Sequence, residues 1–131
     1  MYKKPELPKK GEIVPFEKIC MLISHYYLYD VLEYLAKHGP PEKPFSSDGC
    51  SLWVDKCHGH DIYPACFKHD LRYWCGVPGD EVGRLLADAE FAKDIAKITG
   101  CAELARTMFI GVGVGGTDKL PTSFRWGFGR E

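Results

Sequence analysis

The sequence predicts a small all-α protein that folds as one domain. Apolar residues recur at helical spacing in three segments, alternating strand patterns are almost absent, and glycine or proline stands at each predicted helix end. The chain has 131 residues, of which 45% are hydrophobic and 27% are charged. This length and balance are typical of one globular domain.

The first predicted helix follows a polar N-terminal arm, residues 1–15. The arm contains four prolines or glycines and two Lys-Lys pairs, so we expect it to be flexible and residues 16–131 to form the single domain. Apolar side chains at helical spacing predict one long helix over residues 16–38. Gly39 and Pro40 supply its stop signal.

A long loop, residues 40–61, separates this helix from the next one. It is rich in proline, glycine and polar residues, and loops of this length inside a compact domain are usually functional. The second helix is expected to open near Pro64, because proline is well tolerated in a first helical turn, and to end at Gly76.

Asp80 is a suitable N-cap for a third helix over residues 81–99, which Gly100 would end. A short fourth helix is expected over residues 101–110. The remaining residues, 111–131, are rich in glycine and aromatic residues and have no clear period.

The charge balance argues against a dedicated nucleic-acid binder. The chain has 17 Lys and Arg against 18 Asp and Glu, whereas nucleic-acid-binding domains usually carry a basic excess. The longest apolar stretch, residues 19–35, is interrupted by polar and charged residues, so we expect no transmembrane segment. No apolar signal-peptide core stands near the start, which fits a cytosolic protein or one whose signal was removed.

Asp88 is a carboxylate on the apolar face of the third predicted helix, in line with Leu85, Ala92 and Ile95. A buried carboxylate is costly without a partner, and His69 on the second helix is the obvious one if the two helices pack antiparallel. Such a pair fixes the imidazole tautomer and leaves the other ring nitrogen free to act as a base. The alternative is a structural polar pair between helices.

Asp70 cannot share this partner, because adjacent helical residues point about 100° apart. It faces the direction of the long loop, which contains Asp48 and Gly49. Two carboxylates and the loop carbonyls would form a hard-oxygen site, for which a flexible loop favours calcium over magnesium. A cation beside a histidine base is a layout of hydrolytic enzymes, although Asp-Gly alone is most often a turn.

Three motifs follow one another along the chain. They are Asp-Gly-Cys at residues 48–50, Ala-Cys-x-x-His-Asp at residues 65–70 with Tyr73 behind it, and Asp-x-x-Phe-x-x-Asp at residues 88–94. Together they resemble the secreted phospholipase A2 superfamily, most closely its prokaryotic and fungal branch, over about residues 45–100. The resemblance implies a phospholipase A2-like fold in which two antiparallel core helices carry the His/Asp site, beside a long metal-binding loop and an N-terminal helix.

The resemblance implies calcium-dependent hydrolysis of a phospholipid acyl ester at a membrane surface. His69 would be the general base that activates water, Asp88 would orient its imidazole, and Tyr73 would hydrogen-bond to Asp88. Candidate membrane contacts are the Tyr26–Tyr29 cluster, for which ordinary core packing is the favoured interpretation, and Phe124, Trp126 and Phe128 of the C-terminal segment.

The resemblance also implies a calcium site and a disulfide. Asp48 and Asp70 would bind the ion together with the backbone carbonyl of Gly49. Cys50 and Cys66 would be bonded and would tie the metal loop to the catalytic helix. This pairing favours an oxidising compartment, so we expect a secreted or periplasmic protein, and we expect a monomer.

The other cysteines are assigned by position alone. Antiparallel packing would bring Cys101 near Cys57, which makes these two a candidate second disulfide. Cys20 and Cys75 have no assigned partner, and the alternative is that they are free buried thiols.

Two further functions remain open. A zinc-stabilised interaction domain could use the Cys and His side chains that cluster in and after the long loop, namely Cys57, His58, His60, Cys66 and His69. Zinc binding by Cys66 and His69 would exclude the phospholipase-like site. A non-catalytic, phospholipase-like lipid-binding module is the second alternative, although such proteins often lose the histidine or the calcium aspartate, and both are present here.

Overall fold

The computed structural model of the chain describes residues 5–47, 56–57, 59–115 and 125–130. It is mostly helical, which confirms the all-α prediction. The helices are α1 (Phe16–His25), α2 (Tyr29–His38), α3 (Tyr63–Cys75), α4 (Glu81–Thr99), α5 (Ala102–Gly115) and the 3-10 turn η1 (Phe128–Arg130). Two short strands, β1 (Lys56–Cys57) and β2 (His60–Asp61), pair antiparallel ahead of α3.

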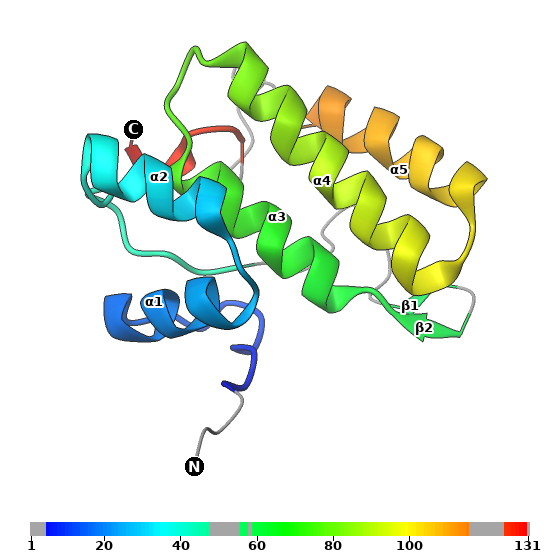
Figure 1. Cartoon of the computed structure of the whole chain (residues 1–131), viewed down its shortest axis with the longest axis horizontal. Coiled ribbons are helices and arrows are strands. Elements are labelled where there is room, and N and C mark those ends of the chain that lie inside the picture. The colour runs from blue at the N-terminus through cyan, green and yellow to red at the C-terminus, as the bar shows by residue number, and fades with distance from the viewer. Residues whose placement is uncertain (1–4, 48–55, 58, 116–124, 131) are drawn as a thin grey trace.

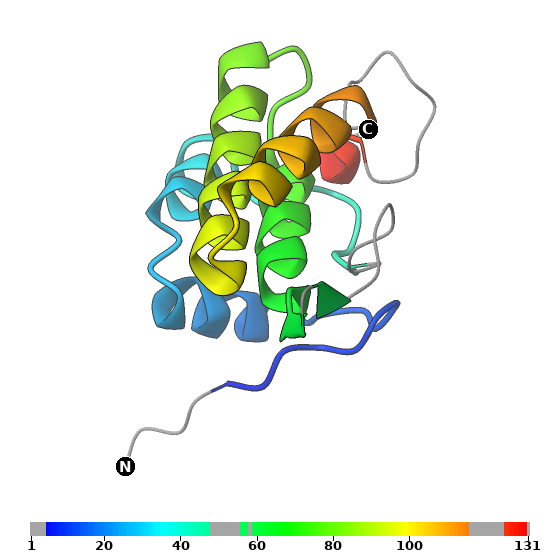
Figure 2. The ribbon, with the colours of Figure 1, turned by 90° about the vertical axis from the view of Figure 1, so that its right-hand side faces the viewer.

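The central element is α3, and α4 runs beside it in the opposite direction (Figure 1). α1 and α2 lie on one side of α3, whereas α5 packs on the far side of α4 (Figures 1 and 2). Every residue from Ala65 to Cys75 is buried except Lys68. The polar side chains of α3 therefore need partners inside the protein.

The predicted single helix over residues 16–38 is wrong, because the structure divides it into α1 and α2. Tyr27 adopts a φ of 55°, in the left-handed region that a helix interior does not use. Leu28 follows it and is only 2% exposed. The turn thus places the apolar side chain of Leu28 in the core. The sequence did not reveal the turn, because the aromatic residues around it continue the helical periodicity.

The predicted ends of the next two helices agree with the structure. α3 has Pro64 in its first turn and Gly76 after its last residue. α4 spans the predicted residues 81–99, with the Gly83 N–H donating to Asp80 Oδ1 at 3.0 Å at its start and Gly100 at a φ of 71° after its end. α5 extends beyond the predicted fourth helix and reaches residue 115.

The arm that precedes α1 is attached to the domain over residues 11–14. The Gly11 N–H donates to the Ser47 carbonyl at 2.8 Å, and the Val14 N–H donates to the Phe45 carbonyl at 2.9 Å. Val14 is 4% exposed. These contacts join this part of the arm to the residues that enter the long loop.

The described C-terminal residues, 125–130, pack against the end of α3. Trp126 is 1% exposed, and its indole N–H donates to the Val77 carbonyl at 2.8 Å. A side chain at Gly76 would collide with the Trp126 ring, so glycine is required there. Trp126 is therefore a core residue and not the membrane contact that the sequence suggested.

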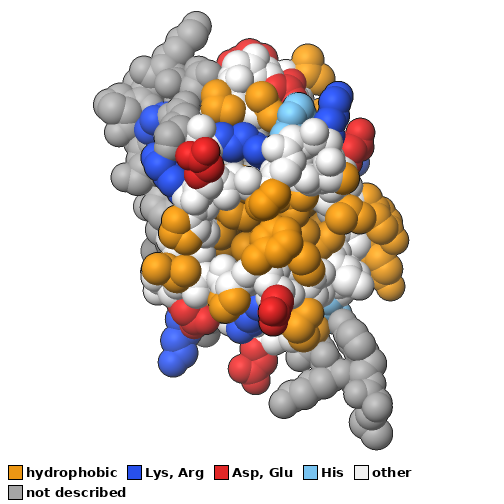
Figure 3. Space-filling view, turned by 90° about the vertical axis from the view of Figure 1, so that its left-hand side faces the viewer, with side chains coloured by type: hydrophobic (Ala, Val, Ile, Leu, Met, Phe, Trp, Pro, Cys, Tyr) orange, Lys and Arg blue, Asp and Glu red, His pale blue; other side chains and the backbone are white. Residues whose placement is uncertain are grey.

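Hydrophobic side chains also reach the surface on the α1 and α2 side, where they gather near the middle of the face drawn in Figure 3. Tyr27 and Tyr29 are 72% and 68% exposed, so the favoured core interpretation is wrong for these two tyrosines. Among the helices of the described residues, none is long and apolar enough to cross a membrane.

Candidate active site

The centre of the site is a hydrogen bond between the two central helices. His69 Nε2 on α3 lies 2.8 Å from Asp88 Oδ1 on α4, and both residues are buried. The expected contact between them is thus present. An ionised carboxylate only accepts hydrogen bonds, so Nε2 carries the proton and Nδ1 keeps the lone pair of the neutral ring.

Tyr73 contributes a second donor to the same carboxylate oxygen. It lies one turn after His69 on α3, and its hydroxyl donates to Asp88 Oδ1 at 2.6 Å. Burial, followed by the negative charge of Asp88 and the hydrogen bond to it, raises the pKa of the Tyr73 hydroxyl, while Arg84 opposes the shift. Tyr73 therefore remains a protonated donor, as the resemblance implied.

The three marked residues of the Asp-x-x-Phe-x-x-Asp motif all face α3. In addition to the Asp88 contact, the Phe91 ring lies 4.8 Å from the His69 ring, centroid to centroid. Asp94 Oδ2 lies 3.1 Å from Lys68 Nζ. Asp88 and Phe91 thus both contact His69, and Asp94 pairs with the residue before it, so the motif holds α4 against this part of α3.

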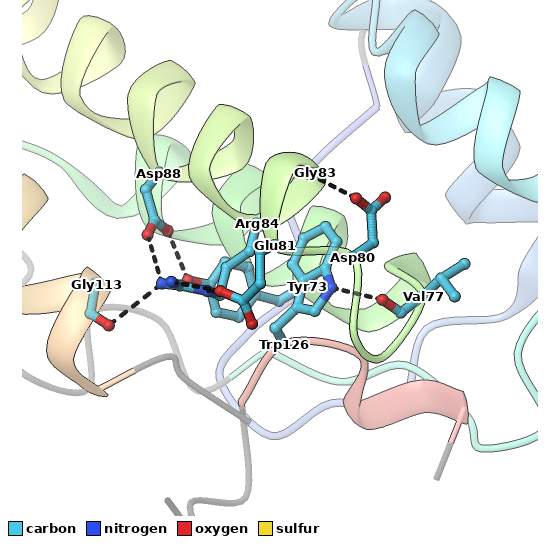
Figure 4. Close-up of polar contacts among 9 residues, drawn as sticks. All are labelled: Tyr73, Val77, Asp80, Glu81, Gly83, Arg84, Asp88, Gly113 and Trp126. Atoms are coloured by element: carbon cyan, nitrogen blue, oxygen red, sulfur yellow. Dashed lines mark hydrogen bonds and ion pairs between the residues drawn. The ribbon is translucent and has the colours of Figure 1, made fainter. Parts of the chain in front are cut away.

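Arg84 is a member of the site that sequence reasoning missed. Its Nη1 lies 3.5 Å from Asp88 Oδ2 and donates to the Gly113 carbonyl of α5 at 3.3 Å (Figure 4). The available signal was the spacing of four between Arg84 and Asp88, which places both on one face of α4. The carbonyl of Gly113 could not be assigned, because its position depends on how α5 packs.

Asp70 faces the start of the long loop, as predicted. Its Oδ2 accepts a hydrogen bond from the Ser47 hydroxyl at 2.7 Å, and both side chains are buried. The other predicted calcium ligands, Asp48 and Gly49, lie outside the described residues, so the ligand set remains a prediction. Within the part of the chain that the structure describes, no group of three or more His, Cys, Asp or Glu side chains could hold a metal ion.

Four cysteine side chains lie in the described part of the chain. Cys66 is disulfide-bonded, whereas Cys20, Cys75 and Cys101 are free. Cys50 lies outside the described residues, so its pairing with Cys66 remains a prediction.

The expected disulfide between Cys57 and Cys101 is wrong, because Cys101 is a free thiol. Cys101 directly precedes α5, where its Sγ accepts the Leu104 N–H at 3.4 Å and caps the helix. The alternative of free buried thiols holds for Cys75, whose pKa is raised to about 12 by burial and then by the charge of Asp30. It is wrong for Cys20, which is free but exposed.

The competing zinc set is not assembled among the described residues. Cys66 is disulfide-bonded and His69 contacts Asp88, so these two ligands are already engaged. His60 is exposed on β2. His58 and the Cys57 side chain lie outside the described part of the chain.

No family model matches the chain, and no curated protein or solved structure matches it. A function is therefore proposed below from the side-chain geometry and from the resemblance of the motifs.

Proposed function

We propose that this protein is a calcium-dependent hydrolase that cleaves an acyl ester of a phospholipid. The observation that carries the proposal is the buried His69–Asp88 pair at 2.8 Å, with Asp70 next to the histidine and facing the long loop. A merely structural polar pair needs no second buried carboxylate beside it. A histidine base and a hard-oxygen donor in adjacent positions are what ester hydrolysis by water requires.

In the proposed reaction His69 is the general base. Its Nε2–H donates to Asp88, so the Nδ1 lone pair can accept a proton from the attacking water. Asp88 then stabilises the imidazolium that forms, without itself becoming protonated. Tyr73 donates to the same carboxylate oxygen and limits its rotation, which keeps the imidazole aligned.

Asp70 and Ser47 are the described residues that could hold calcium. The buried Asp70 carboxylate accepts the Ser47 hydroxyl, and Ser47 directly precedes the predicted ligands Asp48 and Gly49. Carboxylate, hydroxyl and carbonyl oxygens are donors that calcium accepts, so the donor chemistry fits. When bound, calcium supplies Lewis-acid polarisation of an ester carbonyl.

A membrane surface in an oxidising compartment is the proposed place of action. The exposed Tyr27 and Tyr29 side chains support contact with lipid, because amphipathic rings favour the boundary between membrane and water. The disulfide at Cys66 supports a secreted or periplasmic protein, since disulfides are rare in the cytosol.

The test is release of fatty acid from phospholipid vesicles with calcium, with a chelator, and with the variant His69→Ala. We expect chelation and His69→Ala each to remove nearly all activity, because removal of a general base typically costs about 10²–10⁴-fold. His38→Ala is the matched control, because His38 is an exposed histidine on α2, and it should retain full activity.

Activity that survives both the chelator and His69→Ala would contradict the mechanism. Vesicle binding without turnover under any divalent ion would instead favour the lipid-binding module. Stoichiometric zinc in the purified protein would favour the zinc-stabilised domain.

A further inference from the structure

We propose that Arg84 is a positioning residue, which holds the Asp88 carboxylate in the orientation that lets one oxygen serve both His69 and Tyr73. The catalytic part of this inference rests on the function proposed above. Its structural part, the alignment of Asp88 toward His69, stands without it.

The two oxygens of Asp88 have different partners. Oδ1 accepts from His69 at 2.8 Å and from Tyr73 at 2.6 Å, whereas Oδ2 lies 3.5 Å from Arg84 Nη1. Asp88 is 1% exposed, so the cation compensates a charge that water does not reach. A carboxylate bound differently at its two oxygens cannot exchange them without breaking these contacts.

α5 closes the Oδ2 side of the carboxylate. A methyl group added at Gly113 would lie 3.8 Å from Asp88 Oδ2. The Gly113 carbonyl accepts from the same Arg84 nitrogen that faces Asp88. Arg84 thus joins Asp88 to the backbone of the neighbouring helix (Figure 4).

The guanidinium is also held from its other end. Nη2 and Nε of Arg84 donate to Glu81 Oε2 at 2.9 Å and 3.2 Å. Desolvation lowers the pKa of Arg84, but the hydrogen bond and charge of Glu81, with smaller attractions from Tyr73 and Asp88, raise it overall. The planar, permanently charged guanidinium is held by Asp88, Gly113 and Glu81. Such a group is suited to orienting a carboxylate, and a flexible ammonium group is less suited to it.

If Arg84 formed only a structural salt bridge, its contact with Glu81 would be sufficient. Such a salt bridge would not need Asp88 as a buried partner. Glu81 is half-exposed in this pair, and surface pairs of this kind contribute little. The contact with Asp88 is different, because removing one partner of a buried charge pair leaves the other uncompensated. The matched comparison is therefore Arg84→Gln, which removes both contacts, against Glu81→Gln, which affects only the surface contact.

The experiment combines kinetics with proton NMR. The proton that His69 Nε2 shares with Asp88 should give a resonance far downfield, which reports their alignment without any substrate. We expect Arg84→Gln to shift or broaden this resonance and to lower kcat about 10- to 100-fold with KM within about twofold, the loss expected from misplacing a catalytic group. Arg84→Lys should restore part of both. Glu81→Gln keeps an acceptor oxygen for the guanidinium and leaves the Asp88 contact in place, so its effect on both should be much smaller than that of Arg84→Gln.

Unchanged kcat and an unchanged resonance in folded Arg84→Gln would overturn the proposal. Equal effects of Arg84→Gln and Glu81→Gln would also overturn it, because they would indicate a general role in α4. If Arg84→Gln does not fold, Arg84→Lys still tests whether residue 84 orients Asp88. A wild-type resonance with wild-type kcat in Arg84→Lys would show that the guanidinium is not needed for this orientation. If the wild-type protein shows no hydrolysis, the proposed function fails, while the resonance still decides whether Arg84 aligns Asp88.

Discussion

The two sides of α3 bury polar side chains in different ways. The side facing α4 carries His69 and Tyr73, both bonded to one carboxylate that is itself matched by Arg84. The side facing α2 carries Arg72, whose Nε donates to Asp30 Oδ2 at 2.7 Å. Within the described part of the chain, Arg72 Nη1 is buried without a hydrogen-bond partner.

The α2 side also contains a cavity of about 60 Å³ beside Arg72, lined by Asp30, Tyr34, Cys75 and apolar side chains. Its volume exceeds the space of on the order of 10–15 Å³ that a water needs, but its lining is mostly apolar and offers a water few partners. Arg72 is buried without such a network of partners, so burial of a charged group does not by itself identify a candidate functional site. The side chains around Asp88 bond to one another and fix its geometry, which makes this set the better candidate for a functional site.

The largest expected effect comes from Asp88→Ala. It leaves Arg84 without its buried counter-charge and His69 and Tyr73 without their acceptor, so unfolding should become easier by about 3–5 kcal/mol. Denaturant unfolding measures this loss. Glu90→Ala on the same helix is the control, since its pair with Lys93 is exposed and should contribute at most about 1 kcal/mol. Equal losses in the two variants would remove the distinction between the buried network and an ordinary surface pair.

Tyr73→Phe should have a smaller effect on stability and a specific effect on turnover. Loss of a hydrogen bond to a charged group costs about 1.5–3 kcal/mol, and the freed carboxylate would align His69 less well. Tyr34→Phe is the matched control, because Tyr34 donates to Asp80 Oδ2 at 2.6 Å away from the site. Thermal unfolding and kcat should separate the two variants, with kcat reduced only in Tyr73→Phe. A similar drop in kcat in both would argue against a role of Tyr73 in alignment.

The α4 side of α3 could be predicted because its signals are local. Helical spacing placed Asp88 on an apolar face, and a buried carboxylate requires a partner, which the next helix offered as His69. The angle of about 100° between adjacent helical residues also predicted that Asp70 faces the loop and not Asp88.

Features that depend on tertiary packing could not be predicted. The bond from Arg84 to a carbonyl of α5 and the bond from Ser47 to Asp70 both cross the fold, so neither of these two contacts has a local signal. The turn at Tyr27 was missed because its aromatic and apolar neighbours continue the helical pattern through the break. The expected disulfide between Cys57 and Cys101 was wrong, because Cys101 is a free thiol that caps α5.

The smallest expected effect is that of Arg72→Met on the α2 side. Methionine keeps much of the side-chain volume and removes the buried nitrogen that lacks a partner, so the free energy of unfolding should change by less than about 1 kcal/mol in either direction. The Asp30 side chain is 47% exposed and can be solvated once Arg72 is gone. Asp30→Asn should cost more, because it keeps the buried guanidinium and removes its counter-charge.

Urea unfolding of the two variants gives the comparison directly. An Arg72→Met loss larger than that of Asp30→Asn would mean that the Arg72 guanidinium is a net stabilising group. The two sides of α3 would then differ only in geometry and not in how well their buried charges are compensated.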